Sequence, residues 1–401
     1  MRILITCDRY PGNLSDGLTL RIFHYVNRLR AQHTFDLVCL DDVDAIEQGS
    51  NEMFGSITRV PRPDRKQLTS FFGRLIDAFN PYSLYPGSPL AAGCVHQYLD
   101  SNNYDLVWDA GCNMLANIAL ARKRGIPLLA DQVDDAFLTL GRDFSQANGL
   151  YSKLWLAKQY VLQWLFYLRY LANAECVMFV SEADARSFSC HFPWAKCAVI
   201  ENGVDEEYFA CDAISNPHAS KTQHEMVFEG SMSFQPNIDA ALYFANEIFP
   251  LIKSSVPDAR LIIVGRSPVP CILALQSENI DVTGTVEDIR PYLSQAWVFV
   301  CPMRTGAGIK NKILQAWAMS MAVVSTSAGS GSLTVIDGKD IIIRDDPKEF
   351  AKAVIELFED NGQMLSIGRA GRDRILKQYT WNEKSVELRD LMHVILRKEK
   401  A

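Results

Sequence analysis

The chain has 401 residues, of which 48% are hydrophobic and 22% charged, and this composition predicts a globular protein of two or three domains. Its net charge of -7 argues against nucleic acid as the main partner, because a phosphate backbone demands a clustered excess of cations. The ten cysteines are scattered without a C-x-x-C pair, which predicts neither a zinc site nor a disulfide framework but reduced thiols in a cytoplasmic protein.

The first half of the chain predicts an α/β domain, because short strand-like runs alternate with longer helical patterns. Its opening run, MRILITC, is too short for a secretory signal and is followed at once by Asp8, which favours a strand. The predicted strands cover residues 2–7, 35–40, 106–109, 128–131, 176–180 and 198–200. The predicted helices include residues 19–32, 114–124 and 181–188.

Residues 150–172 predict an amphipathic helix rich in Trp, Tyr and Leu. The segment carries Lys153, Lys158 and Arg169, and no window of about 18 uncharged apolar residues exists, so a membrane-spanning helix is not expected. Two interpretations stay open. Packing in the core is the favoured one, and peripheral contact with a membrane interface is the other.

The second half repeats the alternation and predicts a second α/β domain. Its predicted strands cover residues 226–229, 259–264, 280–283, 298–301, 322–325 and 341–343. Its predicted helices cover residues 237–255, 286–295, 311–320 and 347–360, and a charged helix follows at 381–398. A turn at 202–205 and a polar, hinge-like segment at 211–225 mark the boundary. The predicted domains are therefore 1–204 and 205–380, with a closing segment at 381–401.

The stretch 301–319, CPMRTGAGIKNKILQAWAM, predicts a strand, a glycine turn and a helix that form a candidate anion site. A buried strand leads to Arg304, and Gly306 and Gly308 allow the backbone to turn or to approach a ligand closely. Lys312 leads into the helix, whose free N–H groups and dipole would favour an anion. The alternative is an ordinary connection with solvated lysines.

The loop after the first strand carries Gly12 and Gly17 but lacks the G-x-G-x-x-G fingerprint, so an NAD-linked oxidoreductase is poorly supported. At a helix N-terminus, Gly17 could still offer its N–H to a phosphate.

Three strand ends in the second half carry further candidates, because ligands bind at the carboxyl ends of strands in open α/β sheets. These ends carry Gly230 and Ser231, Gly265 and Arg266, and Gly284 and Val286. Asn237 is predicted to cap the helix after the first of them. Simple turns with a helix cap are the alternative interpretation.

These motifs, in their order and spacing, resemble glycosyltransferase family 4. The second half carries the series FEGSMSFQPNIDAALYF, IVGRSP, VTGTVEDIRPYLSQA, VFVCPMRTGAGIKNKILQAWAM and YTWNE. RYPGNLSDGLTLRIFHYVNRLR, ADQVDD and IENGVDEEYF resemble the matching first half. The resemblance is closest to the exopolysaccharide-associated sugar transferases of that family, whose loop typically reads R-x-G-x-G-x-x-x-K-x-L-E-A-M-A.

The resemblance implies a GT-B fold, in which two Rossmann-like domains face a cleft and a C-terminal helix crosses back onto the first domain. It also implies a retaining transfer of sugar from a nucleoside-diphosphate sugar to a hydroxyl acceptor, with no metal ion and no other cofactor. Preorganised cations and N–H groups would stabilise the leaving diphosphate. By this resemblance Arg304, Lys312, Gly306, Gly308 and the Gly17 loop would bind the diphosphate. Gly265, Arg266, Gly284 and Val286 would lie near the base and ribose.

One position departs from the family pattern. The glutamate of L-E-A-M-A, which holds the ribose hydroxyls, is replaced by Gln315 after Leu314. A carboxylate accepts two charge-assisted hydrogen bonds from a diol, whereas an amide offers one acceptor and one donor group. Weaker donor binding is therefore expected, and a catalytically weak protein that binds a nucleotide or a partner transferase is the alternative function.

Candidates on the acceptor side come from ADQVDD, where Asp131 and Asp134 follow a predicted strand end. They could orient the acceptor hydroxyl or contact the sugar, and a helix N-cap with solvated acids is the alternative. The expected acceptor is a polysaccharide, a glycolipid or a small molecule. The expected location is cytoplasmic, with membrane association left open.

Overall fold

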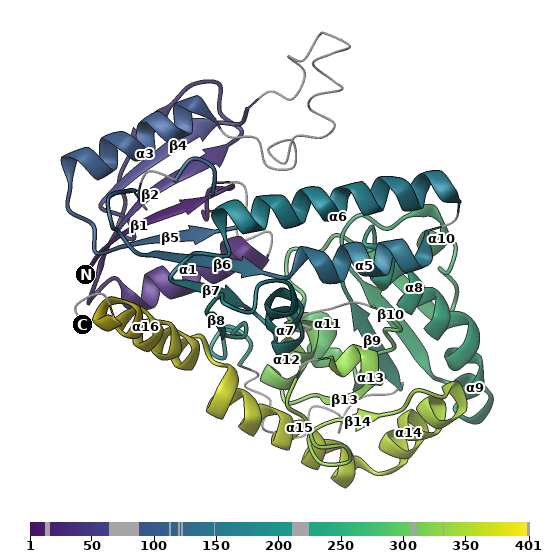
Figure 1. Ribbon diagram of the computed structural model, residues 1–401. Coiled ribbons are helices and arrows are strands. Elements are labelled where there is room, and N and C mark those ends of the chain that lie inside the picture. Colours follow the sequence, from purple (N-terminus) through teal and green to yellow (C-terminus); the bar gives the residue numbers. More distant parts are fainter. Residues whose placement is uncertain are drawn as a thin grey trace. The chain divides into compact units, whose positions relative to one another are not determined.

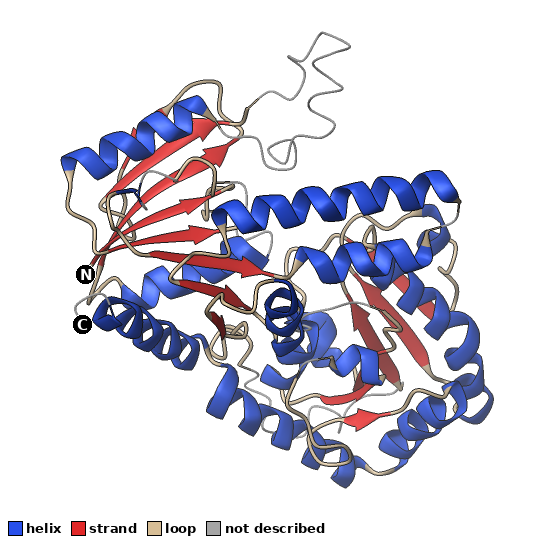
Figure 2. Cartoon of the chain, viewed as in Figure 1, coloured by secondary structure: helices blue, strands red, loops and turns tan. Residues whose placement is uncertain are grey.

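The computed structural model describes residues 1–12, 17–63, 88–111, 114–118, 121, 123–147, 149–210, 224–305, 311–331 and 333–398. The chain divides into two compact units (Figure 1). Unit 1 comprises Met1–Glu201 and Lys384–Ala401, and unit 2 comprises Asn202–Glu383. Each unit is a sheet of mostly parallel strands with helices packed on it (Figure 2), so the prediction of two α/β domains is confirmed.

The described strands of unit 1 form one sheet in the order β3-β4-β2-β1-β5-β6-β7-β8. Neighbouring strands run parallel, except that β3 pairs antiparallel with β4. The bounds are β1 (Arg2–Cys7), β2 (Thr34–Asp41), β3 (Glu47–Gly49), β4 (Ser56–Pro61), β5 (Leu106–Ala110), β6 (Leu128–Val133), β7 (Cys176–Phe179) and β8 (Cys197–Val199). The central strands are almost wholly buried, which explains their apolar sequences.

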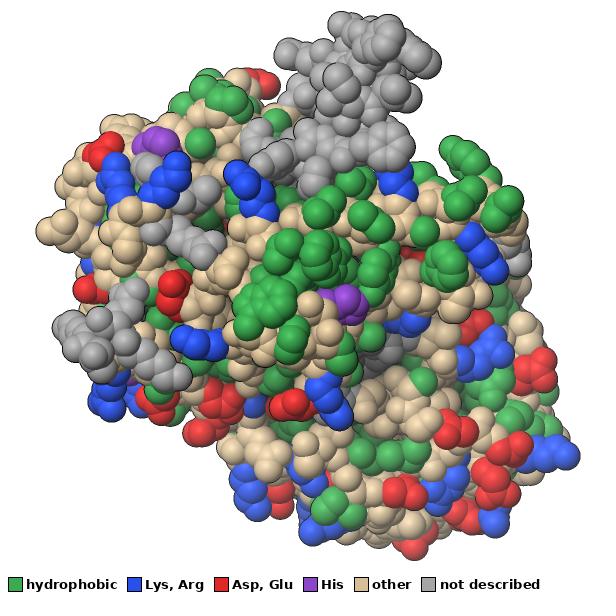
Figure 3. Space-filling view, viewed as in Figure 1, with side chains coloured by type: hydrophobic (Ala, Val, Ile, Leu, Met, Phe, Trp, Pro, Cys, Tyr) green, Lys and Arg blue, Asp and Glu red, His purple; other side chains and the backbone are tan. Residues whose placement is uncertain are grey.

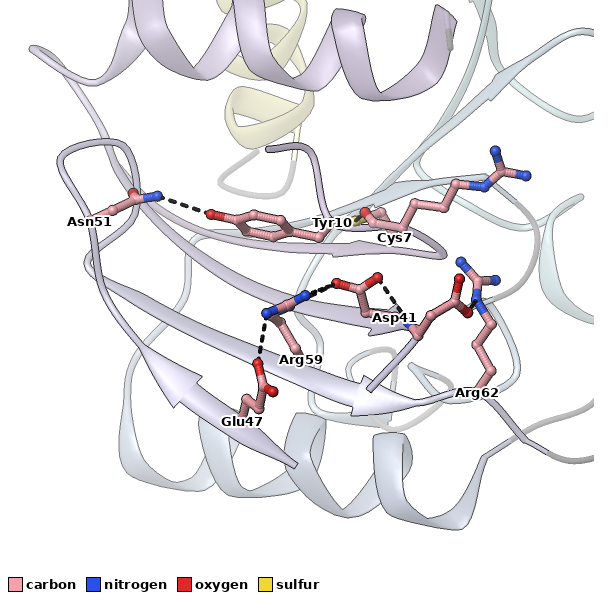
Figure 4. Close-up of polar contacts among 9 residues, drawn as sticks. Cys7, Tyr10, Asp41, Glu47, Asn51, Arg59 and Arg62 are labelled. Carbon is pink, nitrogen blue, oxygen red and sulfur yellow. Dashed lines mark hydrogen bonds and ion pairs between the residues drawn. The ribbon is translucent and has the colours of Figure 1, made fainter. Parts of the chain in front are cut away.

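Strands β3 and β4 escaped prediction, because their polar residues give no apolar run. Arg59 on β4 fixes this edge of the sheet: its guanidinium donates to Asp41 Oδ2 at 2.7 Å and to Glu47 Oε2 at 2.6 Å (Figure 4). The same guanidinium lies 5.2 Å from the ring centroid of Tyr10, whose hydroxyl accepts from Asn51 Nδ2 at 3.3 Å. Electrostatic contacts thus hold a short strand that buries little surface.

The described helices of unit 1 are α1 (Gly17–Leu29), α3 (Pro89–Ser101), α5 (Ala136–Gln146), α6 (Leu150–Tyr170), α7 (Glu182–His191) and most of α16 (Trp381–Lys398). Serine side chains cap the N-termini of two of these helices. Ser88 accepts from Ala91 N at the start of α3, and Ser181 accepts from Asp184 N at the start of α7. The predicted helix 114–124 lies partly outside the described residues.

Helix α16 packs on unit 1 through Leu388, Met392 and Ile395, which are buried. At its start in this unit, Lys384 Nζ lies 3.3 Å from Glu201 Oε2. Residues at the C-terminus of the chain therefore complete the fold of the N-terminal unit.

The described strands of unit 2 form a parallel sheet in the order β11-β10-β9-β12-β13-β14. The bounds are β9 (Glu225–Glu229), β10 (Arg260–Val264), β11 (Ile280–Gly284), β12 (Val298–Cys301), β13 (Ala322–Ser325) and β14 (Ile342–Ile343). Each strand lies within two residues of its prediction. The predicted hinge falls mainly on residues 211–223, which lie outside the described residues.

The helices of unit 2 include α8 (Gln235–Tyr243), α9 (Phe249–Ser255), α10 (Pro270–Leu273), α11 (Arg290–Gln295), α12 (Asn311–Ala318), α13 (Ser327–Ser330), α14 (Pro347–Glu359) and α15 (Asn361–Arg374). Two π-helical turns, η3 (Phe244–Ile248) and η4 (Ile375–Tyr379), interrupt the regular helices. The helix predicted at 237–255 is helical throughout, as α8, η3 and α9 in succession, and its π-helical turn lies just before Pro250, which has no N–H to continue the α-helical pattern.

The helix predicted at 286–295 begins only at Arg290. Asp288 Oδ1 accepts the backbone N–H of Arg290 at 2.9 Å, a local bond that competes with an earlier helix start. Within the described parts of the chain, no helix combines the length and apolar character that crossing a bilayer requires.

The cysteines within the described ranges are all free, and Cys7, Cys39, Cys94, Cys176 and Cys301 are buried.

Candidate functional site

Three strand ends come together at the carboxyl edge of the unit 2 sheet. Gly230 N donates to Val264 O at 3.0 Å, and Gly265 N donates to Gly284 O at 3.2 Å. Met232 N donates to Arg266 O at 2.9 Å, so the loops after β9, β10 and β11 lie side by side. The structure thus brings Gly230, Gly265 and Gly284 to one edge of the sheet.

At two of these positions the backbone geometry requires glycine. A Cβ on Gly265 would lie 1.7 Å from Gly230 O, so a side chain at this position would force the two loops apart. Gly284 has φ +69°, a left-handed conformation that residues with a Cβ adopt at a cost. Close approach of bare backbone is the arrangement that a bound ligand needs at a strand end.

Lys312, on the first turn of α12, is buried beside these glycines with 9% of its surface exposed. Its Nζ donates to Asn237 Oδ1 at 2.8 Å and lies 4.6 Å from the ring centroid of Phe228. A Cβ on Gly230 would lie 3.0 Å from that Nζ. Burial lowers the pKa of Lys312, and Cys301 and Glu229 oppose this shift. The site therefore holds a cation in a poorly hydrated place.

Contrary to the sequence prediction, the Asn237 side chain does not cap a helix. Helix α8 starts after Phe234, and the Asn237 side chain bridges instead of capping. Its Nδ2 donates to Ser231 O at 3.0 Å, while its Oδ1 accepts from Lys312. Asn237 therefore connects the loop after β9 to the cation of α12, a role that no local sequence signal indicates.

Arg304 lies after β12 with its side chain half exposed. Its Nε donates to Asp239 Oδ2 at 3.0 Å, its Nη2 contacts Asp239 Oδ1, and its guanidinium lies 4.5 Å from the ring centroid of Tyr243. The pairing with Asp239 and the desolvation cost act in opposite directions, and the pKa of Arg304 is raised overall. No local sequence pattern indicates the pairing with Asp239, which lies on α8.

The remaining candidates of unit 2 occupy varied environments. Leu314 is fully buried in the core, so only its backbone could face a ligand, whereas Gln315 is half-buried on α12. Ser231 is half-buried, its Oγ 3.2 Å from that of Ser233, and Val286 packs against the core. Arg266 is exposed. Gly306 and Gly308 lie outside the described residues.

In unit 1, Asp131 ends up in a buried ion pair. Arg21 Nε, on α1, donates to Asp131 Oδ2 at 2.8 Å, and both side chains are fully buried. Arg21 Nη1 also donates to Glu201 O at 3.3 Å. Burial raises the pKa of Asp131, and the charge and hydrogen bond of Arg21 act in the opposite direction. In this structure Asp131 therefore positions Arg21, and its carboxylate does not face solvent as an acceptor-binding group would.

Two further residues of the ADQVDD segment stand out, Val133 for its backbone conformation and Asp134 for its exposure. Val133 has φ +62°, a left-handed conformation that is a true outlier for a β-branched residue. The strain coincides with a register shift between β6 and β7. Asp134 follows with an exposed side chain. Strained backbone at a strand end is typical of binding sites, which supports interest in Asp134.

Two buried carboxyl groups in unit 1 were not predicted. Asp109, on β5, accepts from Thr6 Oγ1 at 2.7 Å, and its Oδ2 has no hydrogen-bond partner among the described residues. Burial raises its pKa well above the ordinary value, and Asp8 and Asp131 add to the effect. Burial likewise raises the pKa of Asp135, before α5, to about 6.

Gly17 is the first residue of α1, so its N–H has no partner within the helix. The preceding loop residues 13–16 lie outside the described residues.

Two family models match the chain. One, described as Glycosyltransferase Family 4, matches residues 15–208, and the other, described as Glycosyl transferases group 1, matches residues 223–360. A GDP-mannose-dependent alpha-(1-6)-phosphatidylinositol monomannoside mannosyltransferase of Mycolicibacterium smegmatis is 28% identical over 248 residues. This match covers 56% of the present chain and 64% of the relative. The chain spans less than two thirds of the length of such curated relatives.

Solved structures with the same fold cover nearly the whole chain. Sucrose-phosphate synthase of Thermosynechococcus elongatus superposes with a TM-score of 0.72 at 14% identity, covering 99% of this chain and 100% of that one. Anabaena HepE in complex with UDP gives a TM-score of 0.68 at 14% identity, covering 98% and 100%. At this level of identity the likeness concerns the fold.

Proposed function

The chain belongs to glycosyltransferase family 4 and has the GT-B fold of two Rossmann-like units, and on this basis we propose that it transfers a sugar from a nucleoside-diphosphate sugar to a hydroxyl acceptor. The proposed transfer retains the anomeric configuration and needs no metal ion. The acceptor hydroxyl attacks the anomeric carbon on the face from which the diphosphate leaves. As the new C–O bond forms, the old one breaks, its electron pair stays with the diphosphate, and the proton of the acceptor hydroxyl passes to an oxygen of the departing diphosphate.

The observation that carries this proposal is the buried ammonium of Lys312 at the carboxyl edge of the unit 2 sheet. Cleavage of the donor builds negative charge on the diphosphate, and a cation in a poorly hydrated site stabilises such charge more than a solvated one would. Gly230 and Gly265 present backbone at the same edge without side chains. A diphosphate placed there would be bound by charge and backbone together.

Arg304 is the second cation that we propose for the diphosphate. Its guanidinium could bind two phosphate oxygens at once, as it now binds the two oxygens of Asp239. Because this ion pair is half exposed, exchanging the carboxylate for a phosphate would cost little. Gly306, Gly308 and Gly17 remain proposed donor contacts through their N–H groups.

The acceptor is proposed to bind unit 1, with Asp134 as the group that orients its hydroxyl. Asp134 is exposed and follows the strained Val133, whereas Asp131 is occupied by Arg21. Asp131 would then act as a positioning residue. Polysaccharides, glycolipids and small molecules remain the candidate acceptors, and a cytoplasmic location stays a prediction.

The direct test is a panel of sugar nucleotides. The donor base is open, because the mannosyltransferase relative is named for GDP-mannose and the HepE structure holds UDP. Release of free nucleotide from one of the UDP, GDP, ADP or dTDP sugars, increased by a hydroxyl acceptor, is the expected result. Unchanged release after addition of a chelator would support the metal-free chemistry. Silence across the whole panel would refute the proposal.

A second candidate function is a catalytically weak protein that binds a nucleotide or a partner transferase. The glutamine at position 315 favours it, since the amide offers the ribose diol weaker bonds than a carboxylate. The variant Gln315→Glu separates the two functions. A large gain in donor binding or turnover would indicate a weakened native site, and a loss would identify glutamine as an adaptation.

A further inference from the structure

Helix α6 exposes a long apolar face to solvent. Leu150, Tyr151 and Leu154 are 75%, 83% and 61% exposed, and Trp155, Val161 and Leu165 continue the same face. Hydrophobic side chains accordingly gather over α6 in the space-filling view (Figure 3). At about 100° per residue these positions form one stripe along a helix about 30 Å long.

The opposite side of α6 already provides the packing that the fold requires. The buried residues of the helix are Leu156, Leu162, Gln163, Phe166 and Tyr167, and of these Phe166 and Tyr167 belong to the main core cluster of unit 1. Core packing, the favoured interpretation of the sequence, therefore accounts for only one side of the helix. A helix that is apolar on two faces normally buries both of them.

Within the segment that carries the exposed face, all charged side chains have one sign. Residues 144–174 contain no Asp or Glu, although the whole chain carries a net charge of -7. Lys153 and Arg169 are exposed on α6, and Lys158 is half-buried there. Apolar and aromatic side chains interleaved with cations are typical of helices that lie in the interface of an anionic bilayer.

A hollow at the C-terminal end of α6 has the same character. This cavity of about 310 Å³ has apolar walls that include Leu115, Ile118 and Leu128, with Lys123 and Arg169 among its lining residues. Both cations are exposed. The hollow lies toward the start of β6, which is the opposite edge of the sheet from Asp134. It therefore extends the basic and apolar face away from the proposed acceptor site.

We propose that the exposed face of α6 docks on the surface of an anionic lipid bilayer. Leu150, Leu154 and Val161 enter the boundary of the acyl chains, and Tyr151 and Trp155 lie at the level of the headgroups. The lysines and the arginine contact lipid phosphates. A second copy of the chain fits less well, because a two-fold interface would bring the same cations together with no acid from this segment to pair them.

Vesicle flotation of the full chain tests this docking. We expect the protein to float with vesicles of phosphatidylcholine and phosphatidylglycerol, to stay unbound with phosphatidylcholine alone, and to lose binding as salt rises. The double variant Tyr151→Glu/Leu154→Glu should bind at least about thirtyfold more weakly, since each charge near an anionic surface changes affinity roughly fivefold. Lys153→Gln should bind about fivefold more weakly by the same rule.

The matched control is Val386→Glu/Val394→Glu, which adds the same charge at two exposed positions of α16, also in unit 1. It should bind like the natural chain. Thermal unfolding and nucleotide release are measured on every variant, so a failed fold or a failed transfer reaction is distinguishable from a failed docking.

Three results would overturn the proposal. The first is a natural chain that ignores anionic vesicles, and the second is a control variant that loses as much binding as the α6 variants. The third is a dimer that the α6 double variant dissociates while vesicles bind neither form, because the face would then belong to a second copy. If the double variant does not fold, the Lys153→Gln variant and the salt series decide.

Discussion

Replacing Lys312 with methionine separates a cation held for a ligand from a cation held for the fold. Methionine keeps an unbranched apolar chain in the space of the lysine stem and removes the ammonium. The change removes the bond to Asn237 Oδ1 and the contact with the Phe228 ring. It leaves the surrounding glycine loops as they are.

The effect on stability is a difference between two terms of similar size. The charged hydrogen bond contributes about 1.5–3 kcal/mol and the ring contact about 1 kcal/mol. Against them stands the desolvation of a buried ammonium, which costs several kcal/mol and is the largest cause of the lowered pKa of Lys312. We expect the free energy of unfolding to change by no more than about 1 kcal/mol, while turnover falls by a factor of about 10²–10³.

The assays are urea unfolding and nucleotide release with the donor found in the panel, with Lys348→Met as the control for an exposed lysine of the same unit. The pH dependence adds an independent check. Because the folded pKa of Lys312 lies below its unfolded value of 10.5, the natural chain should gain stability as pH rises from the folded pKa towards 10.5. The methionine variant should lack this gain.

Two outcomes would refute the assignment of Lys312 to the donor diphosphate. Full turnover in the methionine variant would show that the ammonium takes no part in the reaction. A loss of about 3 kcal/mol or more in unfolding free energy, with donor affinity unchanged, would identify Lys312 as a structural cation.

Three further predictions concern other parts of the molecule. Asp135→Asn should raise the free energy of unfolding at pH 7 by up to about 3 kcal/mol. The reason is that the Asp135 carboxyl, with a folded pKa of about 6, makes the natural protein less stable as pH rises from 3.8 to 6. Urea unfolding at pH 4 and pH 7 would show this loss only in the natural chain. Gly265→Ala should cost about 3 kcal/mol or more through the steric clash, whereas Gly284→Ala should cost only about 1 kcal/mol for its left-handed φ; equal losses in thermal unfolding would contradict this contrast. Arg304→Ala should raise the donor KM about tenfold and change stability by less than about 1 kcal/mol, since its ion pair is half exposed; an unchanged KM would remove Arg304 from the donor site.

The buried strands of both sheets were predictable because a buried parallel strand has a continuous apolar sequence. β12 and β13, for example, match their predictions at both ends. β3 was not predicted, because all three of its residues are exposed and its position depends on contacts with Arg59. Helix ends were less predictable, since Asp288 and Pro250 set them through local bonds and a missing N–H.

The site was predictable where residues follow strand ends and unpredictable where side chains meet across the sequence. The glycine positions after β9, β10 and β11 could be found from their spacing along the chain. Asn237 and Lys312 are 75 residues apart, and Arg21 and Asp131 are 110 apart, so no local pattern indicates either pair. Only the packed fold decides that Asp131 is occupied by Arg21 while Asp134 is exposed.

The last turns of α16 have a consequence for how the protein is made. Unit 2 is continuous in the chain, whereas unit 1 lacks Leu388, Met392 and Ile395 until residues 388–395 have been synthesised. Unit 1 therefore cannot complete its core while unit 2 is still being synthesised, although domains usually fold in order from the N-terminus. Early termination after residue 383 would leave unit 2 intact and unit 1 exposed to proteases, and a fragment of residues 1–201 would be a poor substitute for the complete unit.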